Sequence, residues 1–287
     1  MVEMSHEFDA FFEASPSALI EVISAKGSTP REAGTWMLAS PGRIFGTIGG
    51  GQLEYMAIDK ARSLLRSPTF GPTDAVTLDI ALGPEIGQCC GGRVEVSIRA
   101  VDDAMAKQLR NRIRTEMASM PSVFVFGGGH VGRALASALG LLPVRCVVVE
   151  TRADELKGLP STVEARLTAV PEEIAREAPR SSAYLILTHD HALDFLIAAE
   201  ALKRGDAAYV GMIGSRTKKA TFRNWFLKNA NGSAANFSQL VSPIGGNIVK
   251  DKRPEVIAAL AAAEVMTALA EKMREEAVAS RSATTGR

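Results

Sequence analysis

Two adjacent thiols on a glycine-rich stretch are the residues of this chain best suited to chemistry. They lie in Gly87-Gln88-Cys89-Cys90-Gly91-Gly92, where nothing bulky shields the sulfur atoms. Such thiols are placed for reaction or for contact with a soft metal, provided that a nearby cation such as Arg93 favours the thiolate. Zinc would need further ligands at a suitable spacing, and the first half of the chain offers only His6. Cys146 lies in an apolar strand-forming segment and is expected to be structural.

Two glycine-rich stretches precede the thiols and are candidates for binding an anion. Residues 26–34 form an expected loop that contains Thr29 and Arg31, and residues 49–51 are three consecutive glycines before an expected helix. That helix opens with Gln52, which offers no favoured side-chain cap, so the amides of the glycines suit a phosphate or an oxyanion. Two purely structural interpretations remain open: a long hairpin connection for the loop, and a tight strand-to-helix crossing for the glycines.

A third glycine-rich stretch divides the chain into two halves. An apolar run ends in Gly127-Gly128-Gly129-His130-Val131-Gly132, and an Ala- and Leu-rich helical segment follows. A second strand ends in Glu150, about 20 residues after the glycines, where a ribose-binding acid belongs in a dinucleotide fold. Strand, glycine turn, helix and acid together predict a Rossmann-type unit that binds a nucleotide or NAD(P).

Two further strand ends carry polar residues. One expected buried strand delivers Thr188-His189-Asp190-His191, and another is followed by Gly214-Ser215-Arg216-Thr217-Lys218-Lys219. Ligands bind at the carboxyl ends of strands in open α/β sheets, so both turns are candidate sites. Histidines at this spacing on an extended segment point to opposite sides, which argues against both binding one ion, and one ring is expected to cap the next helix. Three cations at a helix start oppose the helix dipole unless an anion lies there, which favours a phosphate or an acidic protein surface.

These sites must be positioned by two domains of different architecture. The fold class is α/β, with a Rossmann-like parallel sheet domain at the C-terminus and a smaller mixed α+β domain at the N-terminus. We expect domain boundaries at residues 1–104, a helical linker at 105–120, the Rossmann-like domain at 121–250, a C-terminal helix at 251–279 and a disordered tail at 280–287. The expected strands cover residues 18–25, 35–38, 44–48, 75–80, 93–99, 123–126, 145–149, 165–169, 183–187, 207–213 and 239–243.

Composition excludes several function classes. The chain has 287 residues, a hydrophobic content of 46% and a formal net charge of +1, with basic residues scattered along it. This pattern gives no footprint for nucleic acid or an anionic membrane. No signal-peptide core precedes the first strand and no apolar run approaches the ~20 residues that span a bilayer, so we expect a cytoplasmic protein. Three cysteines do not form a disulfide framework.

Seven motifs in order resemble the XdhC/CoxI family of xanthine dehydrogenase accessory proteins. The form Gln88-Cys89-Cys90 resembles the xanthine dehydrogenase branch, and Gln52 stands where a histidine is common. The motifs are Lys26-Gly27-Ser28-Thr29-Pro30-Arg31-Glu32-Ala33-Gly34-Thr35, Gly46-Thr47-Ile48-Gly49-Gly50-Gly51-x-Leu53-Glu54, Gly87-Gln88-Cys89-Cys90-Gly91-Gly92, Gly127-Gly128-Gly129-His130-Val131-Gly132, Thr188-His189-Asp190-His191-x-Leu193-Asp194, Tyr209-x-Gly211-x-Ile213-Gly214-Ser215-Arg216 and Pro243-Ile244-Gly245.

The resemblance implies a chaperone for the molybdopterin form of the molybdenum cofactor. Such a protein binds the cofactor, protects it while a cysteine desulfurase exchanges an oxo for a sulfido ligand, and inserts it into apo-xanthine dehydrogenase. The implied partners also include molybdenum-cofactor biosynthesis proteins, and we expect a homodimer, no enzymatic role and molybdenum contact through Cys90. The candidate cofactor-binding residues are Cys90, Cys89, Gln88, Gly49, Gly50, Gly51, Arg31, Thr29, Gly127, Gly129, His130, Gly132, Glu150, His189, Ser215 and Arg216.

Two other hypotheses remain open on sequence grounds. One is an NAD(P)-dependent oxidoreductase that uses Glu150 for the ribose and His189 or His191 as acid and base. The other makes the second half a docking platform, with the basic turn at residues 216–219 as a contact for the target enzyme.

Overall fold

The protein divides into two compact units, each with its own sheet. A computed structural model describes residues 8, 11, 12, 16–71, 73–84, 91–246 and 248–285. The N-terminal unit is Val2–Glu116 and the C-terminal unit runs from Met117 to Arg287, so the division falls within helix α3 (Asp103–Ser119). Gln88, Cys89 and Cys90 lie outside the described residues.

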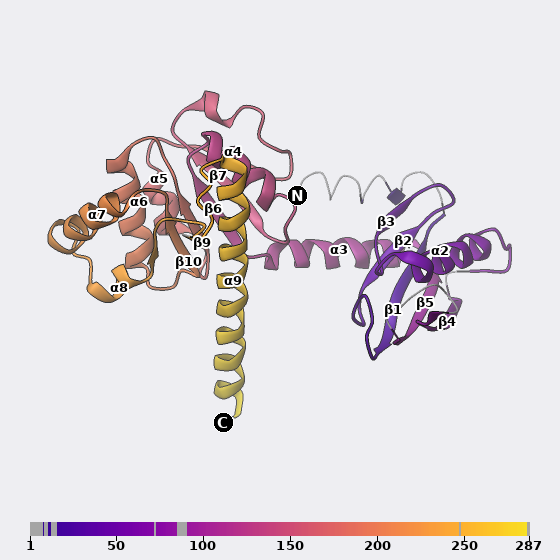
Figure 1. Cartoon of the computed structure of the whole chain (residues 1–287). Coiled ribbons are helices and arrows are strands. Elements are labelled where there is room, and N and C mark those ends of the chain that lie inside the picture. Colours follow the sequence, from indigo (N-terminus) through magenta and orange to yellow (C-terminus); the bar gives the residue numbers. More distant parts are fainter. Residues whose placement is uncertain are drawn as a thin grey trace. The chain divides into compact units, whose positions relative to one another are not determined.

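The N-terminal unit is an antiparallel sheet with the strand order β3-β2-β1-β5-β4. Figure 1 shows helix α2 (Gly51–Leu65) beside this sheet. Strand β5 alternates buried Val94, Val96 and Ile98 with outward polar residues, which is the period-2 pattern of a half-buried strand. The strands are β1 (Ala18–Lys26), β2 (Trp36–Ala39), β3 (Ile44–Gly46), β4 (Ala75–Ala81) and β5 (Arg93–Ala100).

Helix α2 covers the sheet through one stripe of small and apolar residues. Leu53, Ala57 and Ala61 are spaced four apart and are fully buried, so they lie on the same side of the helix. They share a core with residues of β1, β2, β4 and β5. The beginning of α2, and with it the glycine turn before the helix, is therefore fixed against the sheet.

The C-terminal unit is a six-stranded parallel sheet with the order β11-β10-β9-β6-β7-β8. In chain order this is the 3-2-1-4-5-6 arrangement of the doubly wound fold, so the predicted Rossmann-like sheet is confirmed. The strands are β6 (Ser122–Phe126), β7 (Arg145–Glu150), β8 (Glu164–Leu167), β9 (Ala183–Ile186), β10 (Tyr209–Met212) and β11 (Leu240–Val241).

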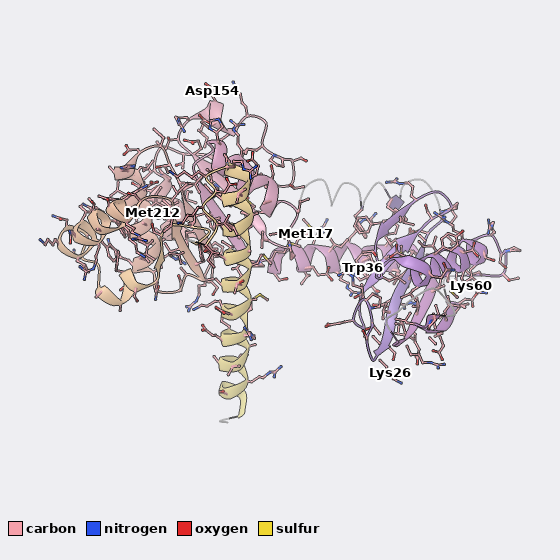
Figure 2. All side chains as sticks on the ribbon, viewed as in Figure 1. Lys26, Trp36, Lys60, Met117, Asp154 and Met212 are labelled. Atoms are coloured by element: carbon pink, nitrogen blue, oxygen red, sulfur yellow. The ribbon has the colours of Figure 1, made fainter. Side chains whose placement is uncertain are left out.

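Helices cover both faces of this sheet, which is why its central strands are apolar throughout. Helices α4 (His130–Leu139) and α9 (Pro254–Thr285) share one core, and α5 (Pro171–Glu177), α6 (His191–Lys203) and α7 (Arg216–Asn229) contribute to the other. Met212 is fully buried in this unit, whereas Lys26 is exposed at the end of β1 (Figure 2). Two short helices, Ala153–Leu156 and α8 (Ala234–Ser238), were not predicted from the sequence.

Helix α9 corrects the expected disordered tail. It runs to Thr285, and Figure 1 shows its second half, in yellow, extending beyond the sheet of its unit. Buried residues of α9 end at Leu269, while Met273 and Val278 are 58% and 64% exposed. The segment after residue 280 continues the helix because it contains no glycine or proline before Thr285. Among the described residues, no helix has the length and apolar character needed to cross a membrane.

Candidate functional site

The loop of residues 26–34 lies directly against the glycine turn that precedes α2. Gly49 has a φ of +124°, and a Cβ atom there would lie 2.8 Å from the ring of Pro30 and 3.4 Å from Cγ of Arg31. Any larger residue at position 49 would clash with the loop. The structure therefore brings together two stretches that the sequence analysis selected separately.

The same loop also contacts the glycines that follow the two thiols. A Cβ atom on Gly92 would lie 2.4 Å from the carbonyl oxygen of Ser28 and 2.8 Å from that of Lys26. The amide of Gly91 donates to the carbonyl of Leu82 at 2.8 Å, and the amide of Leu82 donates to Gly92 at 2.7 Å. These bonds hold together the two ends of the segment that contains Cys89 and Cys90. Gly91, which follows Cys90 directly in the chain, is therefore anchored beside the loop.

A carboxylate of the protein itself takes amides of the glycine turn. Oε2 of Glu54 accepts hydrogen bonds from the amides of Ile48 and Gly50, both at 3.0 Å, and from the hydroxyl of Thr47 at 2.5 Å. The amide of Gly49 donates to Oγ1 of Thr47 at 3.0 Å. The amides of Gly49, Gly50 and Gly51 were expected to be uncovered, and that expectation was wrong for Gly49 and Gly50. The missed signal was an acid in the first turn of the helix, which can reach back to the cap amide.

The cations near this turn differ in whether they have partners. Arg93 makes a bidentate pair with Asp79 at 2.7 and 2.5 Å, and this hydrogen bonding lowers the pKa of Asp79 and raises that of Arg93. Its charge is thus already directed at a carboxylate, which weakens the expected assistance to a thiolate. Arg31 is exposed and has no hydrogen bond or ion pair within the part of the chain that the structure describes. Of the two, Arg31 is the cation available to an external anion.

Cys146 is a structural thiol, as predicted. It lies in β7, is 1% exposed, and burial raises its pKa to about 12. A thiol with such a pKa is protonated at neutral pH and is a poor nucleophile or metal ligand.

The glycines of the turn in the C-terminal unit differ in what surrounds them, as in a nucleotide-binding turn. A Cβ on Gly127 would lie 2.5 Å from the carbonyl oxygen of Leu187, and one on Gly132 would lie 1.9 Å from that of Gly127. These two glycines allow close packing of strand and helix. Gly129, the helix cap, has open space on its Cβ side, and the next residue, His130, is exposed. The turn could therefore be approached by a ligand at Gly129.

Glu150, the predicted ribose-binding acid, is bonded within the protein. It accepts from the amides of Gly128 (3.0 Å), Thr151 (2.8 Å) and Arg152 (3.1 Å), and the Arg152 guanidinium donates to both carboxylate oxygens at 3.3 and 3.1 Å. Burial alone would raise its pKa, but the hydrogen bonds from Arg152 and the three amides outweigh burial and lower the pKa to about 2. A ribose could reach this carboxylate only by displacing Arg152.

The histidines that follow β9 are exposed, and a neighbouring acid, Asp190, caps the next helix. Both His189 and His191 are on the surface, and the side chain of Asp190 caps α6 by accepting from the amide of Ala192 at 2.7 Å. The cap expected from a histidine ring is therefore supplied by Asp190, whose short carboxylate suits an N-cap better.

A buried ion pair joins the first turns of α6 and α7, and it was not predicted from the sequence. Asp194 is fully buried, accepts from the amide and hydroxyl of Thr188 at 2.9 and 2.7 Å, and pairs with Nζ of Lys218. Lys218 also donates to the carbonyl of Ile213 at 3.0 Å. One of the three cations predicted to attract an external anion is thus neutralised inside the protein, and no motif spacing signals a partner 24 residues away.

The other two cations of that turn have different surroundings. Lys219 donates to the carbonyl of Leu240 at 3.1 Å, whereas Arg216 is exposed without a partner among the described residues. Ser215 caps α7 by accepting from the amide of Lys218 at 3.2 Å. Ser215 and Arg216 both line a cavity of about 780 Å³ at the carboxyl end of β10.

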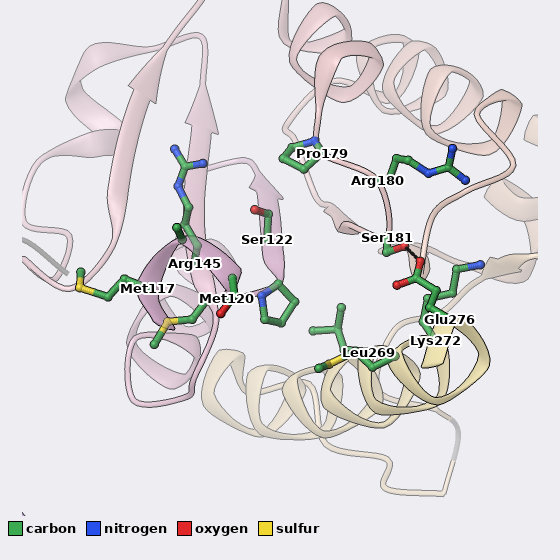
Figure 3. Close-up of a pocket in the computed structure, with 14 residues that line it drawn as sticks. Met117, Met120, Ser122, Arg145, Pro179, Arg180, Ser181, Leu269, Lys272 and Glu276 are labelled. Atoms are coloured by element: carbon green, nitrogen blue, oxygen red, sulfur yellow. Dashed lines mark hydrogen bonds between the residues drawn. The ribbon is translucent and has the colours of Figure 1, made fainter. Parts of the chain in front are cut away.

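A second cavity, of about 660 Å³, lies at the opposite, amino-terminal edge of the same sheet (Figure 3). Its polar groups largely bond one another or their neighbours: Ser181 donates to Glu276, and Arg145 pairs with Glu164 at 2.6 Å. Figure 3 shows Met117, Met120 and Leu269 beside them. Ligands in open α/β sheets bind at the other edge, so we regard the cavity near Ser215 as the stronger candidate.

These features define a two-domain α/β protein whose second domain is a Rossmann domain. Two family descriptions match it: the XdhC Rossmann domain over residues 123–265, and the XdhC and CoxI family over residues 13–73. The chain belongs to the XdhC and CoxI family, which confirms the resemblance inferred from its motifs.

Similar proteins extend this assignment. The Escherichia coli K12 protein YqeB, itself described as uncharacterized, is 26% identical over 267 residues, which cover 88% of this chain and 43% of YqeB. The chain thus spans less than half the length of that relative. A Bacillus halodurans crystal structure described as a xanthine dehydrogenase has a TM-score of 0.75 and 18% identity, over 93% of this chain and 96% of that chain. This likeness shows a shared fold.

Proposed function

We propose that the protein is an accessory factor that binds the molybdenum cofactor in its N-terminal unit and delivers it to apo-xanthine dehydrogenase. The observation that carries this proposal is the packing of the loop of residues 26–34 between Gly49 and Gly92. Gly92, which follows Cys90 by two residues, packs against Lys26 and Ser28 of this loop, and Gly49 packs against Pro30 and Arg31 of the same loop. A soft-metal ligand and an anion ligand are thereby contributed by neighbouring segments.

The residues fit the chemistry of the cofactor. Its terminal phosphate requires a cation without an internal partner, and Arg31 meets that condition. Molybdenum held by sulfur is a soft centre for which a thiolate of Cys90 or Cys89 is a suitable contact. Thr29 and Gln88 supply further polar groups on the same two segments. The amides of Ile48, Gly49 and Gly50 are assigned no phosphate, because Glu54 and Thr47 already use them.

The partners follow from this role. Exchange of an oxo for a sulfido ligand requires a cysteine desulfurase, and loading requires molybdenum-cofactor biosynthesis proteins. The N-terminal unit would hold the cofactor and exclude bulk water from it during these steps, with no catalytic residue of its own.

The alternative of an NAD(P)-dependent oxidoreductase has less support. That function requires Glu150 to accept hydrogen bonds from a ribose, but Arg152 already covers both of its oxygens. His189 and His191 are exposed, and neither has a hydrogen bond within the described residues that would fix it as an acid or base.

The proposal is tested by the molybdenum and pterin content of protein purified from a molybdenum-replete host. We expect wild-type protein to carry both, and Cys90→Ala to carry much less because the soft ligand is removed. Cys146→Ala is the matched control, since it removes a thiol from the C-terminal core and should leave the content unchanged. Absence of molybdenum and pterin from wild-type protein, or equal loss in both variants, would refute the cofactor-binding role.

A further inference from the structure

The cavity at the carboxyl end of β10 combines an apolar floor with a cationic rim. Four segments build it: the turn after β10, the turn of residues 243–246, residues 249–252 and the start of α9, with Val131 of α4 added. Its volume of about 780 Å³ lies within the range of small-ligand pockets. We call the apolar residues of its lining the floor: Val131, Ile213, Pro243, Ile244, Val249, Ile257 and Leu260.

The rim carries three cations that have no internal partner. Arg216, Lys250 and Lys252 are exposed, and none has an ion pair or hydrogen bond within the described part of the chain. The one acid in the lining, Asp251, is held by Arg253, which donates to it at 2.6 and 2.9 Å and keeps its pKa below the usual range. The cavity therefore has a surplus of positive charge that its own residues leave unused.

A ligand of this cavity does not need Glu150, the acid beside the glycine turn. A dinucleotide would have to use Glu150 as well as this cavity, and Arg152 covers Glu150. A ligand confined to the cavity needs only an anionic group for the rim and an apolar ring for the floor. Lys218 contributes no charge to the rim, because it is buried against Asp194.

We propose that this cavity binds a nucleoside monophosphate. Its phosphate lies at Arg216, Lys250 and Lys252, and its base lies on the floor of Ile213, Ile244 and Leu260. The site is in the C-terminal unit and is independent of the cofactor role proposed for the N-terminal unit. No earlier sequence motif includes Lys250 or Lys252.

Calorimetric titration of the full chain with AMP, GMP, glucose 6-phosphate, inorganic phosphate and NAD⁺ tests the proposal. We expect AMP or GMP to bind more tightly than either glucose 6-phosphate or phosphate, because only the nucleotides cover the apolar floor. We expect NAD⁺ to bind no more tightly than AMP. Combined replacement of Arg216, Lys250 and Lys252 by Gln should weaken nucleotide binding on the order of tenfold, since each exposed cation contributes modestly.

Lys228→Gln is the matched control, because Lys228 is an exposed cation of α7 that does not line the cavity. Its nucleotide affinity should equal that of wild-type protein. The three rim residues are exposed, so their replacement leaves the core intact. The proposal is overturned if neither nucleotide binds at millimolar concentration, if glucose 6-phosphate binds equally well, if the triple variant keeps wild-type affinity, or if NAD⁺ binds more tightly than AMP.

Discussion

The two units treat the polar groups at their strand-to-helix turns in different ways. In the C-terminal unit, the acids Glu150 and Asp194 are buried and each is paired with a cation of the same unit, Arg152 or Lys218. In the N-terminal unit, Glu54 is half-buried and accepts from amides and a hydroxyl. The neighbouring cation, Arg31, has no partner in the described residues.

The difference indicates which turn can bind an external anion. A turn whose acid and cation already neutralise each other gains little from a new ligand, because the ligand must first break that pair. A turn with an unpaired cation, as at Arg31 in the N-terminal unit or Arg216 at the start of α7, gains a charge-assisted contact without breaking one. Glycine at a helix start is therefore a weaker indicator of an anion site than the presence of an unpaired cation beside it.

The largest expected effect is that of breaking the buried pair after β9. Asp194→Asn leaves Lys218 buried without a counter-charge and should reduce the free energy of unfolding of the C-terminal unit by about 3–5 kcal/mol. The chain has two tryptophans, one in each unit, so a Trp36→Phe background lets the fluorescence of Trp225 report this unit in urea. Glu200→Gln on the same helix is the control and should cost below about 1 kcal/mol. Equal losses in the two variants would show that the buried pair has no special role.

A smaller loss is expected at the glycine turn of the same unit. Glu150→Gln removes the charge that holds Arg152 and the amide of Gly128, so the free energy of unfolding should fall by about 2–3 kcal/mol. The readout is again Trp225 fluorescence in urea. Glu164→Gln is the control, because Glu164 also pairs with arginines, Arg145 and Arg166, but is one-third exposed. A loss at Glu164 as large as that at Glu150 would contradict the importance of burial.

The lowered pKa of Glu150 predicts a specific dependence of stability on pH. Its folded-state pKa of about 2 lies below its ordinary value, so its contribution is complete above pH ~5 and is lost as the pH falls towards 2. Between pH 6 and 3, wild-type protein should lose about 1–2 kcal/mol from this group, after allowance for the half-exposed Arg152. Urea titrations at several pH values should show a smaller loss in Glu150→Gln. An identical pH dependence in both proteins would mean that Glu150 is not the group responsible.

The smallest stability effect belongs to the N-terminal turn. Glu54→Gln keeps the shape of the side chain but weakens the bonds to Thr47 and two amides, and should cost about 1 kcal/mol. A Trp225→Phe background makes Trp36 the reporter for this unit. Asp59→Asn, an exposed change on the same helix, should be neutral. If Glu54→Gln cost as much as Asp194→Asn, the contrast between the two units would fail.

Much of the fold followed from local patterns. Period-2 alternation in residues 93–99 predicted β5, and apolar strands with a glycine turn and Glu150 predicted the doubly wound sheet, because these signals depend on neighbouring residues. The ion-pair partners of the buried acids could not be predicted from these local patterns. Lys218 stands beside two other cations in the sequence, and only the packing of α6 against α7 buries it against Asp194.

The segments that form the candidate site could be predicted from the sequence, but the partners of their polar side chains could not. The sequence selected residues 26–34 and 49–51, and the structure places them in contact. The sequence alone could not show that Glu54 folds back onto the amides, or that Arg93 pairs with Asp79, because both depend on side-chain direction in the folded unit. Lys250 and Lys252 belong to none of the seven motifs, so the sequence did not single them out.

The most direct test of the account compares the two arginines that distinguish the turns. Molybdenum and pterin are measured per chain in Arg31→Gln and Arg152→Gln, both purified from a molybdenum-replete host. The account predicts reduced content in Arg31→Gln, because the unpaired cation of the N-terminal unit is lost, and wild-type content in Arg152→Gln. Reduced content in Arg152→Gln with wild-type content in Arg31→Gln would contradict it.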